Sequence, residues 1–174
     1  MCEDLIGDYG ILTPLSDRQS IDLSRDVESF EETTDFILAS YLLESDFLDQ
    51  LAEKVDSLQS GVETDWNIIW AMVHEQDTVV GFLDFAGPPN NRGEVILRWS
   101  INPEWKNSPF EREALGKLVD WAFSREECLS VSVVKGISEA DRAETLRRLG
   151  FRGEQIKSGR ESYRCIKTVE GRLL

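Results

Sequence analysis

The stretch GEVILRWSINPEWKNSPFEREALGKLVDWAF, residues 93–123, decides the fold. An apolar run over residues 95–101 stops at Asn102 and Pro103, and a short polar loop leads into a segment whose apolar residues follow the helical period. This spacing is typical of an amphipathic helix packed on a sheet. The residues that carry it are Phe110, Ala114, Leu115, Leu118, Val119, Ala122 and Phe123. A strand that enters a helix through a tight loop places the unpaired N–H groups of the helix N-terminus beside the end of the strand, a position suited to a phosphate.

The length of 174 residues predicts a single domain over residues 1–174 that buries a core without metal or disulfide support. The three cysteines, Cys2, Cys128 and Cys165, are widely spaced and lack any CxxC or His-rich pattern, so we expect neither a zinc site nor a disulfide framework. The acidic start of the chain is unlike a signal peptide, and no apolar run approaches the roughly 18 residues that a membrane span requires. We therefore expect a soluble, cytoplasmic protein without a metal.

The net charge of −14 is concentrated in one part of the chain. Residues 1–65 contain 17 Asp and Glu against three basic residues, whereas residues 66–174 contain 16 acidic and 16 basic residues. Such a field repels nucleic acid and anionic membranes and attracts amines, basic peptides and basic proteins. The acidic residues either recruit a cationic partner or only solvate exposed helix faces, and both interpretations stay open.

The remaining periodicity predicts a mixed α/β (α+β) chain, with an acidic part of one strand and helices over residues 1–65 and a sheet-rich part over residues 66–174. Strands are expected at residues 9–15, 66–73, 78–85, 94–101, 129–134, 152–156 and 161–167. Helices are expected at residues 17–28, 31–43, 46–60, 110–123 and 138–149. Ser16 and Ser138 stand at N-cap positions, and Gly61 stands where a helix ends.

In this order of elements, three short segments are similar to a known family. They are Asn102-Pro103-Glu104, Glu113-Ala114-Leu115 and LRRLGF at residues 146–151. With them, essentially the whole chain resembles the GNAT superfamily of N-acetyltransferases, and within it the RimJ/RimL-like branch. The resemblance implies a mostly antiparallel central sheet of about six to seven strands flanked by helices. It also implies that the strands at 94–101 and 129–134 splay apart and that acetyl-CoA binds in the resulting cleft.

The pyrophosphate loop departs from the family pattern Arg/Gln-x-x-Gly-x-Gly/Ala. Lys106 falls at the Arg/Gln position, Pro109 at the first Gly and Glu111 at the second Gly/Ala. Pro109 has no N–H to donate to a phosphate, and Glu111 brings a negative charge to an anion site. By itself, this segment is a well-formed helix start, with Ser108 as N-cap, Pro109 at the first helical position and Glu111 completing a capping box. The two interpretations are physically opposed.

The resemblance still implies contacts between this loop and the cofactor. The candidate cofactor-binding residues are Ile101, Asn102, Lys106, Asn107, Ser108, Phe110, Arg112 and Arg142. A backbone N–H near Ile101 or Asn102 would polarise the thioester carbonyl. The family's Asn-x-x-Ser segment falls on Glu139 and Arg142, and the Tyr that many members use as a general acid corresponds to Leu146. Acetyl-CoA is therefore the expected cofactor, with binding that is weak or lost.

Glu94, at the start of the central strand, approximates the position of a glutamate that some relatives use as a base, and it is our candidate for the residue that accepts the proton of an ammonium. The alternative for Glu94 is a strand-end carboxylate in solvent. Asp84 and Glu104 are further candidates. The only histidine, His74, is expected in an exposed hairpin turn.

Two tryptophans flank the expected cleft. Trp99 is expected to pack in the core, whereas Trp105 is expected to cover either the cofactor or the helix. Cys128 precedes a buried strand and is expected to be structural.

Two classes of function follow. In the first, the chain is an acetyl-CoA-dependent N-acetyltransferase acting on the primary amine of a cationic acceptor: a protein N-terminus, a polyamine or an aminoglycoside-like small molecule. In the second, it is a catalytically degenerate binding module of the same fold, whose acidic N-terminal face docks a basic protein partner. The oligomeric state stays open, with a homodimer as one expectation.

Overall fold

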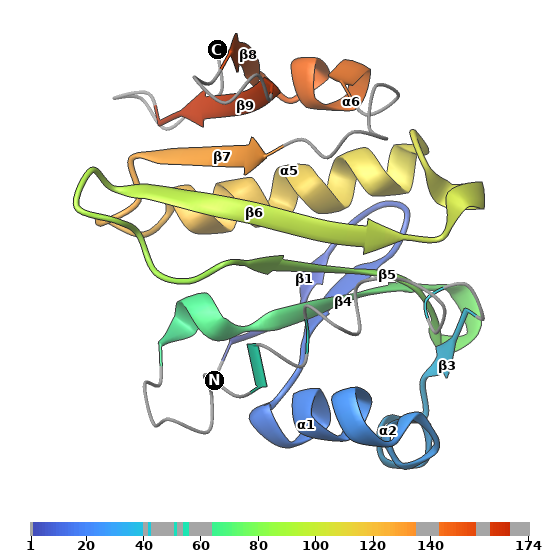
Figure 1. Cartoon of the computed structure of the whole chain (residues 1–174). Helices are drawn as coiled ribbons and strands as arrows, with labels where there is room; N and C mark the ends of the chain where they lie inside the picture. Colours follow the sequence, from blue (N-terminus) through green and yellow to red (C-terminus); the bar gives the residue numbers. More distant parts are fainter. Residues whose placement is uncertain are drawn as a thin grey trace.

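The computed structural model describes residues 2–39, 42, 51, 54–55, 64–134, 143–155 and 161–167, and Figure 1 shows their arrangement. The strands are β1 (Leu5–Ile6), β2 (Ile11–Pro14), β3 (Ile37–Leu38), β4 (Ile69–His74), β5 (Thr78–Phe85), β6 (Glu94–Ile101), β7 (Ser130–Val134), β8 (Arg152–Gln155) and β9 (Glu161–Ile166). The helices are α1 (Asp17–Arg25), α2 (Val27–Thr34), α5 (Pro109–Phe123) and α6 (Ala143–Arg148), and the 3₁₀ turns are η1 (Asp65–Asn67), η2 (Glu75–Asp77) and η3 (Pro103–Trp105).

The strands form one mixed sheet in the order β1-β2-β4-β5-β6-β7-β9-β8, with β3 added beside β5. Neighbours are antiparallel except β6 with β7 and β3 with β5. The predicted α/β class and the mostly antiparallel sheet are confirmed, but the predicted count of six to seven strands is too low for this nine-stranded sheet. The two additional strands, β1 and β3, have two residues each, so they leave no alternation of apolar and polar residues in the sequence.

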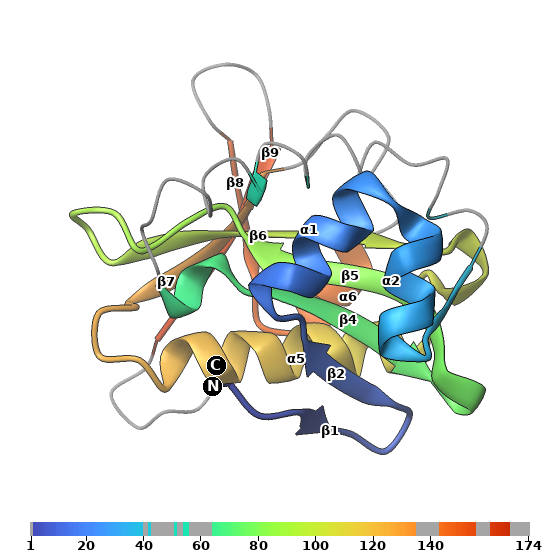
Figure 2. The same ribbon diagram turned by 90° about the horizontal axis from the view of Figure 1, so that it is seen from below.

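Two apolar clusters cover opposite faces of the sheet. Trp70 and Met72 of β4 belong to the cluster that contains the buried side of α5. Ala71 and Val73 belong to the cluster that contains residues of α1 and α2. β4 is therefore covered on both faces, as its apolar residues at both parities predict. Seen from below, α1 and α2 lie over β4 and β5, and α5 lies away from them (Figure 2), which agrees with its place in the other cluster.

The acidic N-terminal segment forms two short helices where longer ones are predicted. α1 begins at the predicted N-cap Ser16, which exchanges hydrogen bonds with Gln19 in a capping box. Asp26 ends α1 and caps α2, since its backbone is extended and its carboxylate accepts from Ser29 N–H at 3.2 Å. α2 ends at Asp35, which adopts a left-handed conformation with φ of 59°.

The helix predicted over residues 31–43 is therefore wrong at residues 35–39, whereas Leu42, the one later residue of that range that the structure describes, is helical. Residues 37 and 38 instead join the sheet as β3, beside Thr78 and Val79. The strand predicted from Trp66 begins at Ile69, because Trp66 lies in the 3₁₀ turn η1.

Two other predictions fall partly outside the described residues. Most of the helix predicted at residues 46–60 lies there, and its described members Leu51 and Val55 are buried. The first half of the helix predicted at residues 138–149, with its N-cap Ser138, also lies there, and α6 is its second half. The closing hairpin is confirmed as β8 and β9.

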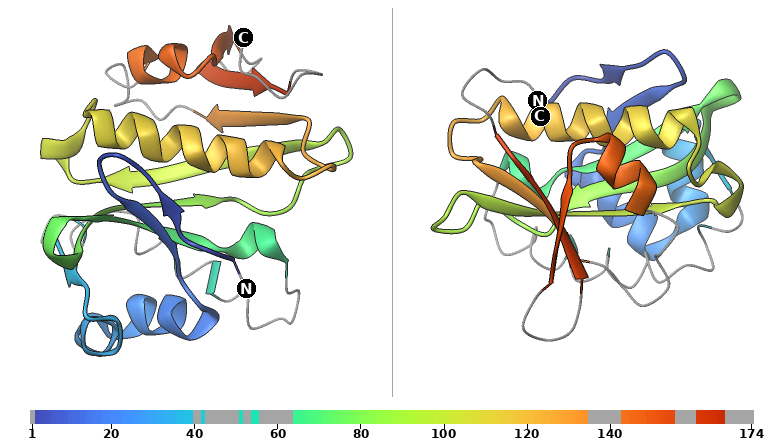
Figure 3. Two further views of the ribbon diagram at one scale, coloured as in Figure 1. Left: turned by 180° about the vertical axis from the view of Figure 1, so that it is seen from behind. Right: turned by 90° about the horizontal axis from the view of Figure 1, so that it is seen from above.

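The hairpin of β1 and β2 is held against α5 by one glutamate, on the side seen from behind in Figure 3. Glu113 Oε1 accepts from Asp8 N–H at 2.7 Å, and Glu113 Oε2 accepts from Tyr9 N–H at 3.0 Å. A β-carbon at Gly10 would lie 2.5 Å from the Phe110 ring, so glycine permits this close approach. The hairpin depends on a helix that lies more than one hundred positions later in the chain.

Gly81 of β5 is a further position where only glycine fits. A β-carbon there would lie 2.6 Å from the carbonyl oxygen of Ser100 on β6 and 2.9 Å from Met72 Sδ. We expect Gly81→Ala to lower the free energy of unfolding by about 1–3 kcal/mol, because a well-packed interior resists an added methyl group. Gly116→Ala in α5 is the matched control, since its nearest contact is Leu149 Cδ2 at 3.4 Å, and it should stabilise by up to about 1 kcal/mol. Urea unfolding of both variants tests the pair, and equal effects would contradict this account.

Candidate active site

Strands β6 and β7 separate after a short paired segment. Their parallel register joins Glu94 with Ser130 and Ile96 with Ser132. The described residues show no pairing beyond this point, although β6 continues to Ile101. The predicted splay is thus confirmed, and α5 runs behind both strands (Figure 1).

Along its second half, β6 turns alternate backbone groups away from β5. Asn102 N–H donates to Val80 C=O at 2.8 Å, which fixes the antiparallel ladder between β6 and β5. In such a ladder, alternate residues of a strand bond to the same neighbour. The N–H and C=O groups of Leu97, Trp99 and Ile101 therefore point away from β5, toward the side from which β7 has turned away.

Ile101 N–H and Asn102 N–H are the two backbone donors predicted for a thioester carbonyl. Because of this ladder, they point in opposite directions. Asn102 N–H is used within the sheet, and the Asn102 side chain accepts from Glu104 N–H at 3.2 Å to begin η3. Ile101 N–H is directed into the splay. Of the two, Ile101 is the donor in position for the predicted role.

Most backbone N–H groups at the N-terminus of α5 donate to acceptors within the protein. Among residues 106–112, Pro109 has no N–H and five residues donate within the protein. The acceptors are Pro103 O for Lys106, Glu111 Oε2 for Asn107, Trp105 O for Ser108, Ser108 Oγ for Glu111 and Ser108 O for Arg112. Only Phe110 N–H has no acceptor within the described residues. In this structure, these N–H groups are directed at acceptors within the protein and do not form an open cradle for a pyrophosphate.

Glu111 occupies the centre of this loop and is fully buried. Its Oε1 accepts from the indole N–H of Trp99 at 3.0 Å, and its Oε2 accepts from Asn107 N–H. A carboxylate at the N-terminus of a helix is also stabilised by the helix dipole. The side chain thus takes the electrostatic position that a phosphate takes at other helix N-termini.

One of the two hydrogen bonds of the predicted capping box is present. Ser108 Oγ accepts from Glu111 N–H at 3.0 Å, as predicted. The return bond from Glu111 goes to Asn107 N–H and not to Ser108 N–H, because Ser108 N–H already donates to Trp105 C=O. Asn107 adopts φ of 60°, which turns its N–H toward the helix.

The other predicted phosphate ligands lie around this loop. Lys106 is exposed and Arg112 is half-buried, whereas Arg142 lies outside the described residues. Asn107 Oδ1 accepts from the hydroxyl of Thr145 on α6 at 2.9 Å, so this bond joins the loop to the last helix. The sequence does not reveal Thr145, although a polar residue beside Leu146 in an apolar helix stripe is a weak signal.

His74 and the tryptophans pack where the loop meets the N-terminal hairpin. His74 is not an exposed turn residue: it ends β4, and its ring lies 4.3 Å from the Trp105 ring and 5.8 Å from the Phe110 ring, centroid to centroid. Trp105 therefore covers the start of α5. Trp99 packs against the α5-side core and donates to Glu111.

Glu94 lies two residues before the splay, on the face of β6 opposite α5. Its Oε1 accepts from Ser132 Oγ and forms an ion pair with Arg164 at 2.9 Å, and its Oε2 accepts from Asn90 Nδ2 at 3.3 Å. The hydrogen bond from Ser132 and the charge of Arg164 hold the pKa of Glu94 below its usual value, against the effect of burial. The carboxylate has the predicted location, but it is a weak base with both oxygens already engaged.

This network predicts a pH-dependent contribution to stability. Because the folded-state pKa of Glu94 is lowered, the stabilisation is complete above the ordinary value of 4.5 and is lost as the pH falls through the lowered one. We expect wild type to exceed Glu94→Gln in free energy of unfolding at pH 6.5, and the difference to shrink below pH 4.5. Urea titrations at several pH values measure it. A difference that stays constant down to pH 3 would refute this assignment.

The other two carboxylates considered as bases differ in environment. Asp84 is buried and bonded by Lys54 Nζ at 2.8 Å and by Arg98 Nε at 3.1 Å. It is committed to these two cations. Glu104 is exposed on η3, beyond the end of β6.

The cysteines are poor nucleophiles in this fold. Burial raises the pKa of both Cys128 and Cys165 to about 11, which agrees with a structural role for Cys128. The described part of the chain contains no cluster of three His, Cys, Asp or Glu residues suited to a metal ion. No helix in that part has the length and apolar character to cross a membrane.

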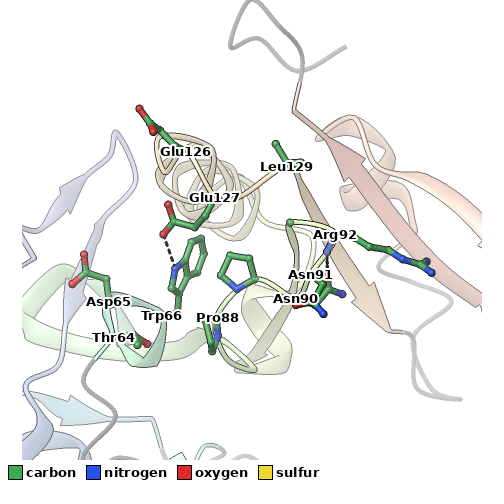
Figure 4. A pocket seen from close by; sticks show the side chains of 12 residues that line it. Thr64, Asp65, Trp66, Pro88, Asn90, Asn91, Arg92, Glu126, Glu127 and Leu129 are labelled. Atoms are coloured by element: carbon green, nitrogen blue, oxygen red, sulfur yellow. Dashed lines mark hydrogen bonds between the residues drawn. The ribbon is translucent and has the colours of Figure 1, made fainter.

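A pocket of about 710 Å³ lies at the opposite end of β6 from the start of α5. Trp66, Pro88 and Leu129 form apolar parts of its wall, and Arg92 and Glu127 form polar parts. Figure 4 shows the Trp66 indole donating to Glu127, at 3.1 Å. This pocket is therefore distinct from the predicted cofactor cleft.

Comparisons with known proteins agree with this geometry. Residues 12–152 match the family model described as "Acetyltransferase (GNAT) domain". The uncharacterized N-acetyltransferase YjdG of Bacillus subtilis (strain 168) is 31% identical over 86 residues, which are 47% of this chain. The match spans about half the length of that relative, 49%.

Solved structures show the same fold at low sequence identity. A ribosomal-protein-S5-alanine acetyltransferase from Vibrio fischeri superposes with a TM-score of 0.62 at 11% identity, covering 95% of this chain and 97% of that one. RimL, an alpha-N-protein acetyltransferase of a ribosomal protein in complex with coenzyme A, gives 0.63 at 12%, covering 94% and 98%. A mutant of the spermidine N-acetyltransferase SpeG from Vibrio cholerae gives 0.55 at 13%, covering 88% and 91%. With the family match over residues 12–152, these likenesses identify the chain as a member of the GNAT acetyltransferase family.

Proposed function

We propose that this chain is an acetyl-CoA-dependent N-acetyltransferase that acts on the primary amine of a cationic acceptor: a protein N-terminus, a polyamine or an aminoglycoside-like small molecule. The observation that carries the proposal is the separation of β6 from β7 beyond Ile96 and Ser132, together with an Ile101 N–H that faces away from β5. A strand edge that faces such a gap can bind the amide groups of a pantetheine arm as it would bind another strand.

The residues of the site fit one half of the cofactor and not the other. The edge of β6 beside the splay fits the pantetheine arm, and Ile101 N–H would donate to the carbonyl of the acyl group. The start of α5 does not fit the pyrophosphate, because Pro109 and Glu111 remove the donors and add a charge. When bound, the cofactor would supply an activated acyl group as a thioester.

The acceptor class follows from the charge of the chain. Residues 1–65 carry a net charge of −14, which raises the local concentration of cationic molecules. The structural neighbours include enzymes named for spermidine and for ribosomal proteins, whose acceptors are amines. We propose the same acceptor chemistry for this chain.

Glu94 remains our candidate for an ionised carboxylate that binds the acceptor ammonium, since its lowered pKa keeps it charged at neutral pH and makes it a weak base. It lies seven residues before Ile101 on β6, roughly 23 Å at the usual rise of a strand, so it cannot receive the proton of an amine that attacks an acyl group held at Ile101 N–H. The rate should therefore follow the ionisation of the acceptor amine and rise with pH.

The test is direct binding of the cofactor. Calorimetric titration of the full chain with acetyl-CoA, followed by an acetyl-transfer assay with spermidine and with N-terminal peptides, should show binding and turnover with at least one cationic amine. Absence of binding at millimolar acetyl-CoA, together with no turnover of any of these amines, would overturn the proposal.

One observation favours the second function, a non-catalytic binding module that docks a basic protein partner. The donors at the start of α5 are used within the protein, as expected if phosphate binding is no longer required. On this alternative, the acidic N-terminal part makes the contact, and within it α2 carries three glutamates and no basic residue. Capture of a basic protein by a chain that binds no acyl thioester would support it.

A further inference from the structure

We propose that Arg98 binds a carboxylate of the acceptor, so that the acceptor is an amine that also carries an acidic group. This inference rests on the proposed acyl transfer and narrows its acceptor class. An amino acid, or a peptide N-terminus with a carboxylate close to its amine, is favoured over a polyamine, which has no carboxylate.

The place of Arg98 in β6 carries the first step. Successive side chains of a strand point to opposite faces, and Leu97 and Ile101 belong to the cluster around α5, so Arg98 points to the other face. It lies two residues beyond Ile96, the last residue of β6 that pairs with β7 in the described part of the chain. It also lies three residues before Ile101, roughly 10 Å at the usual rise of a strand. The side chain is therefore beside the splay, at a distance from the proposed acyl group that a small acceptor can span.

The hydrogen bonds of Arg98 carry the second step. Its bonds to Asp84 use Nε and Nη2, which account for two of its five N–H groups. To the other described residues Arg98 makes no hydrogen bond or ion pair. The remaining N–H groups, on Nη1 and Nη2, form a second fork of the shape that matches a carboxylate. The side chain is 28% exposed, so a solute can reach it while Asp84 stays bound.

The sharing of Asp84 between two cations carries the third step. Asp84 lies directly opposite Arg98 on β5 and also accepts from Lys54 Nζ at 2.8 Å. The side chains of Asp84 and Lys54 are each 5% exposed, so these two charges form a buried pair. Asp84 therefore compensates the charge of Arg98 only in part. An anion that reaches the outer fork of Arg98 meets an attractive cation.

The nearest other carboxylate on this face does not serve Arg98. Glu94 lies four residues earlier on β6 and forms its ion pair with Arg164, on β9. The two arginines thus lie on one face of the sheet and bind different carboxylates of the protein. This arrangement leaves the outer fork of Arg98 to a carboxylate from outside the chain.

The acidic N-terminal part of the chain does not oppose such an acceptor. Charges on its surface act on a solute from a distance and are screened beyond about 8 Å at physiological salt. A two-pronged contact with an arginine acts at hydrogen-bond distance. The long-range field attracts the ammonium end of the acceptor and Arg98 holds its carboxylate end, so a zwitterionic amine satisfies both.

Acceptors that differ only in the carboxylate test the inference on the full wild-type chain. One pair is 4-aminobutyrate and 4-aminobutanamide, and the other is a peptide amide with glutamate or with glutamine as its second residue. We expect kcat/KM to be about tenfold to a hundredfold higher for the acid of at least one pair, as is usual for charge-assisted hydrogen bonds. The pair that responds shows whether the carboxylate comes from a small amino acid or from a peptide side chain.

The other outcomes separate this inference from the proposed function. Equal use of acid and amide in both pairs, or turnover of spermidine alone, would overturn the inference and leave the proposed acetyl transfer intact. Absence of turnover with all five amines would overturn the proposed function, and the inference with it.

Variants then assign the preference to one side chain. Arg98→Gln should reduce the acid-to-amide ratio to about two or less, and Arg98→Lys, which keeps the charge and loses the fork, should give an intermediate ratio. Arg18→Gln is the matched control, because Arg18 is 85% exposed on α1 and its loss should leave the ratio unchanged. An unchanged ratio in Arg98→Gln would overturn the assignment. Thermal melts should show that Arg98→Gln is folded, since Asp84 keeps its bond to Lys54.

Discussion

Replacing both Pro109 and Glu111 by glycine is expected to raise the affinity for acetyl-CoA by about tenfold to a hundredfold. The double variant gives position 109 an N–H, removes the carboxylate and frees Asn107 N–H from its bond to Oε2. A hydrogen bond to a charged group contributes about 1.5–3 kcal/mol, so one or two restored donors account for this range. Calorimetric titration of the variant beside the wild type measures it.

The controls separate the loop from general electrostatics. Glu104→Gln removes an equal charge from the exposed turn η3 without altering the donors of α5, and it should change the affinity less than twofold. The affinity for S-acetylpantetheine should be the same in the double variant and in the wild type. If acetyl-CoA binds equally to all these proteins, the self-capped helix start is not what limits binding. Thermal melts should accompany the titrations, because removal of Glu111 also leaves Trp99 Nε1 without its acceptor.

The largest effect on stability is expected from Asp84→Asn. Asp84 joins Lys54, from the acidic N-terminal part, to Arg98 on β6, and the side chains of Lys54 and Asp84 are each only 5% exposed. Burial lowers the pKa of Lys54, and the charge of Asp84 opposes this effect. Removing one partner of a buried ion pair costs about 3–5 kcal/mol, because the other charge stays buried without compensation. We therefore expect a loss of this size in the free energy of unfolding, measured in urea at pH 7.

An exposed ion pair provides the matched control. Asp65 and Arg125 lie 3.0 Å apart, with side chains that are 60% and 33% exposed. Asp65→Asn should cost less than about 1 kcal/mol, as is usual for pairs in solvent. Similar losses in the two variants would contradict the view that burial makes Asp84 important.

The elements that depend on local sequence pattern could be predicted correctly. The β6 strand, the α5 helix and the N-caps Ser16 and Ser108 could all be predicted, because period and capping chemistry act over a few residues. Residues 35–39 could not, since a left-handed Asp35 ends α2 and the chain then pairs with β5. Tertiary pairing overrode the helical pattern there.

In the candidate site, too, local features could be predicted and long-range contacts could not. The Ser108 cap and the missing N–H of Pro109 could be predicted from side-chain chemistry alone. The partners of the loop could not: Trp99 lies 12 positions before Glu111, and Thr145 lies 38 positions after Asn107. Such contacts depend on which face of β6 meets α5 and on where α6 packs, and neither is encoded in local spacing.

The hydrogen bonds that Glu113 accepts from Asp8 N–H and Tyr9 N–H affect the order in which parts of the chain fold during synthesis. They join positions 105 and 104 residues apart, so the N-terminal hairpin leaves the ribosome long before the helix that holds it. At the usual rate of translation, this delay is roughly 5–20 s. During that time β1 and β2 have no α5 to pack against, and contacts of such long range also form slowly after release. A hairpin that is made early is therefore among the last parts of this fold to reach its final place.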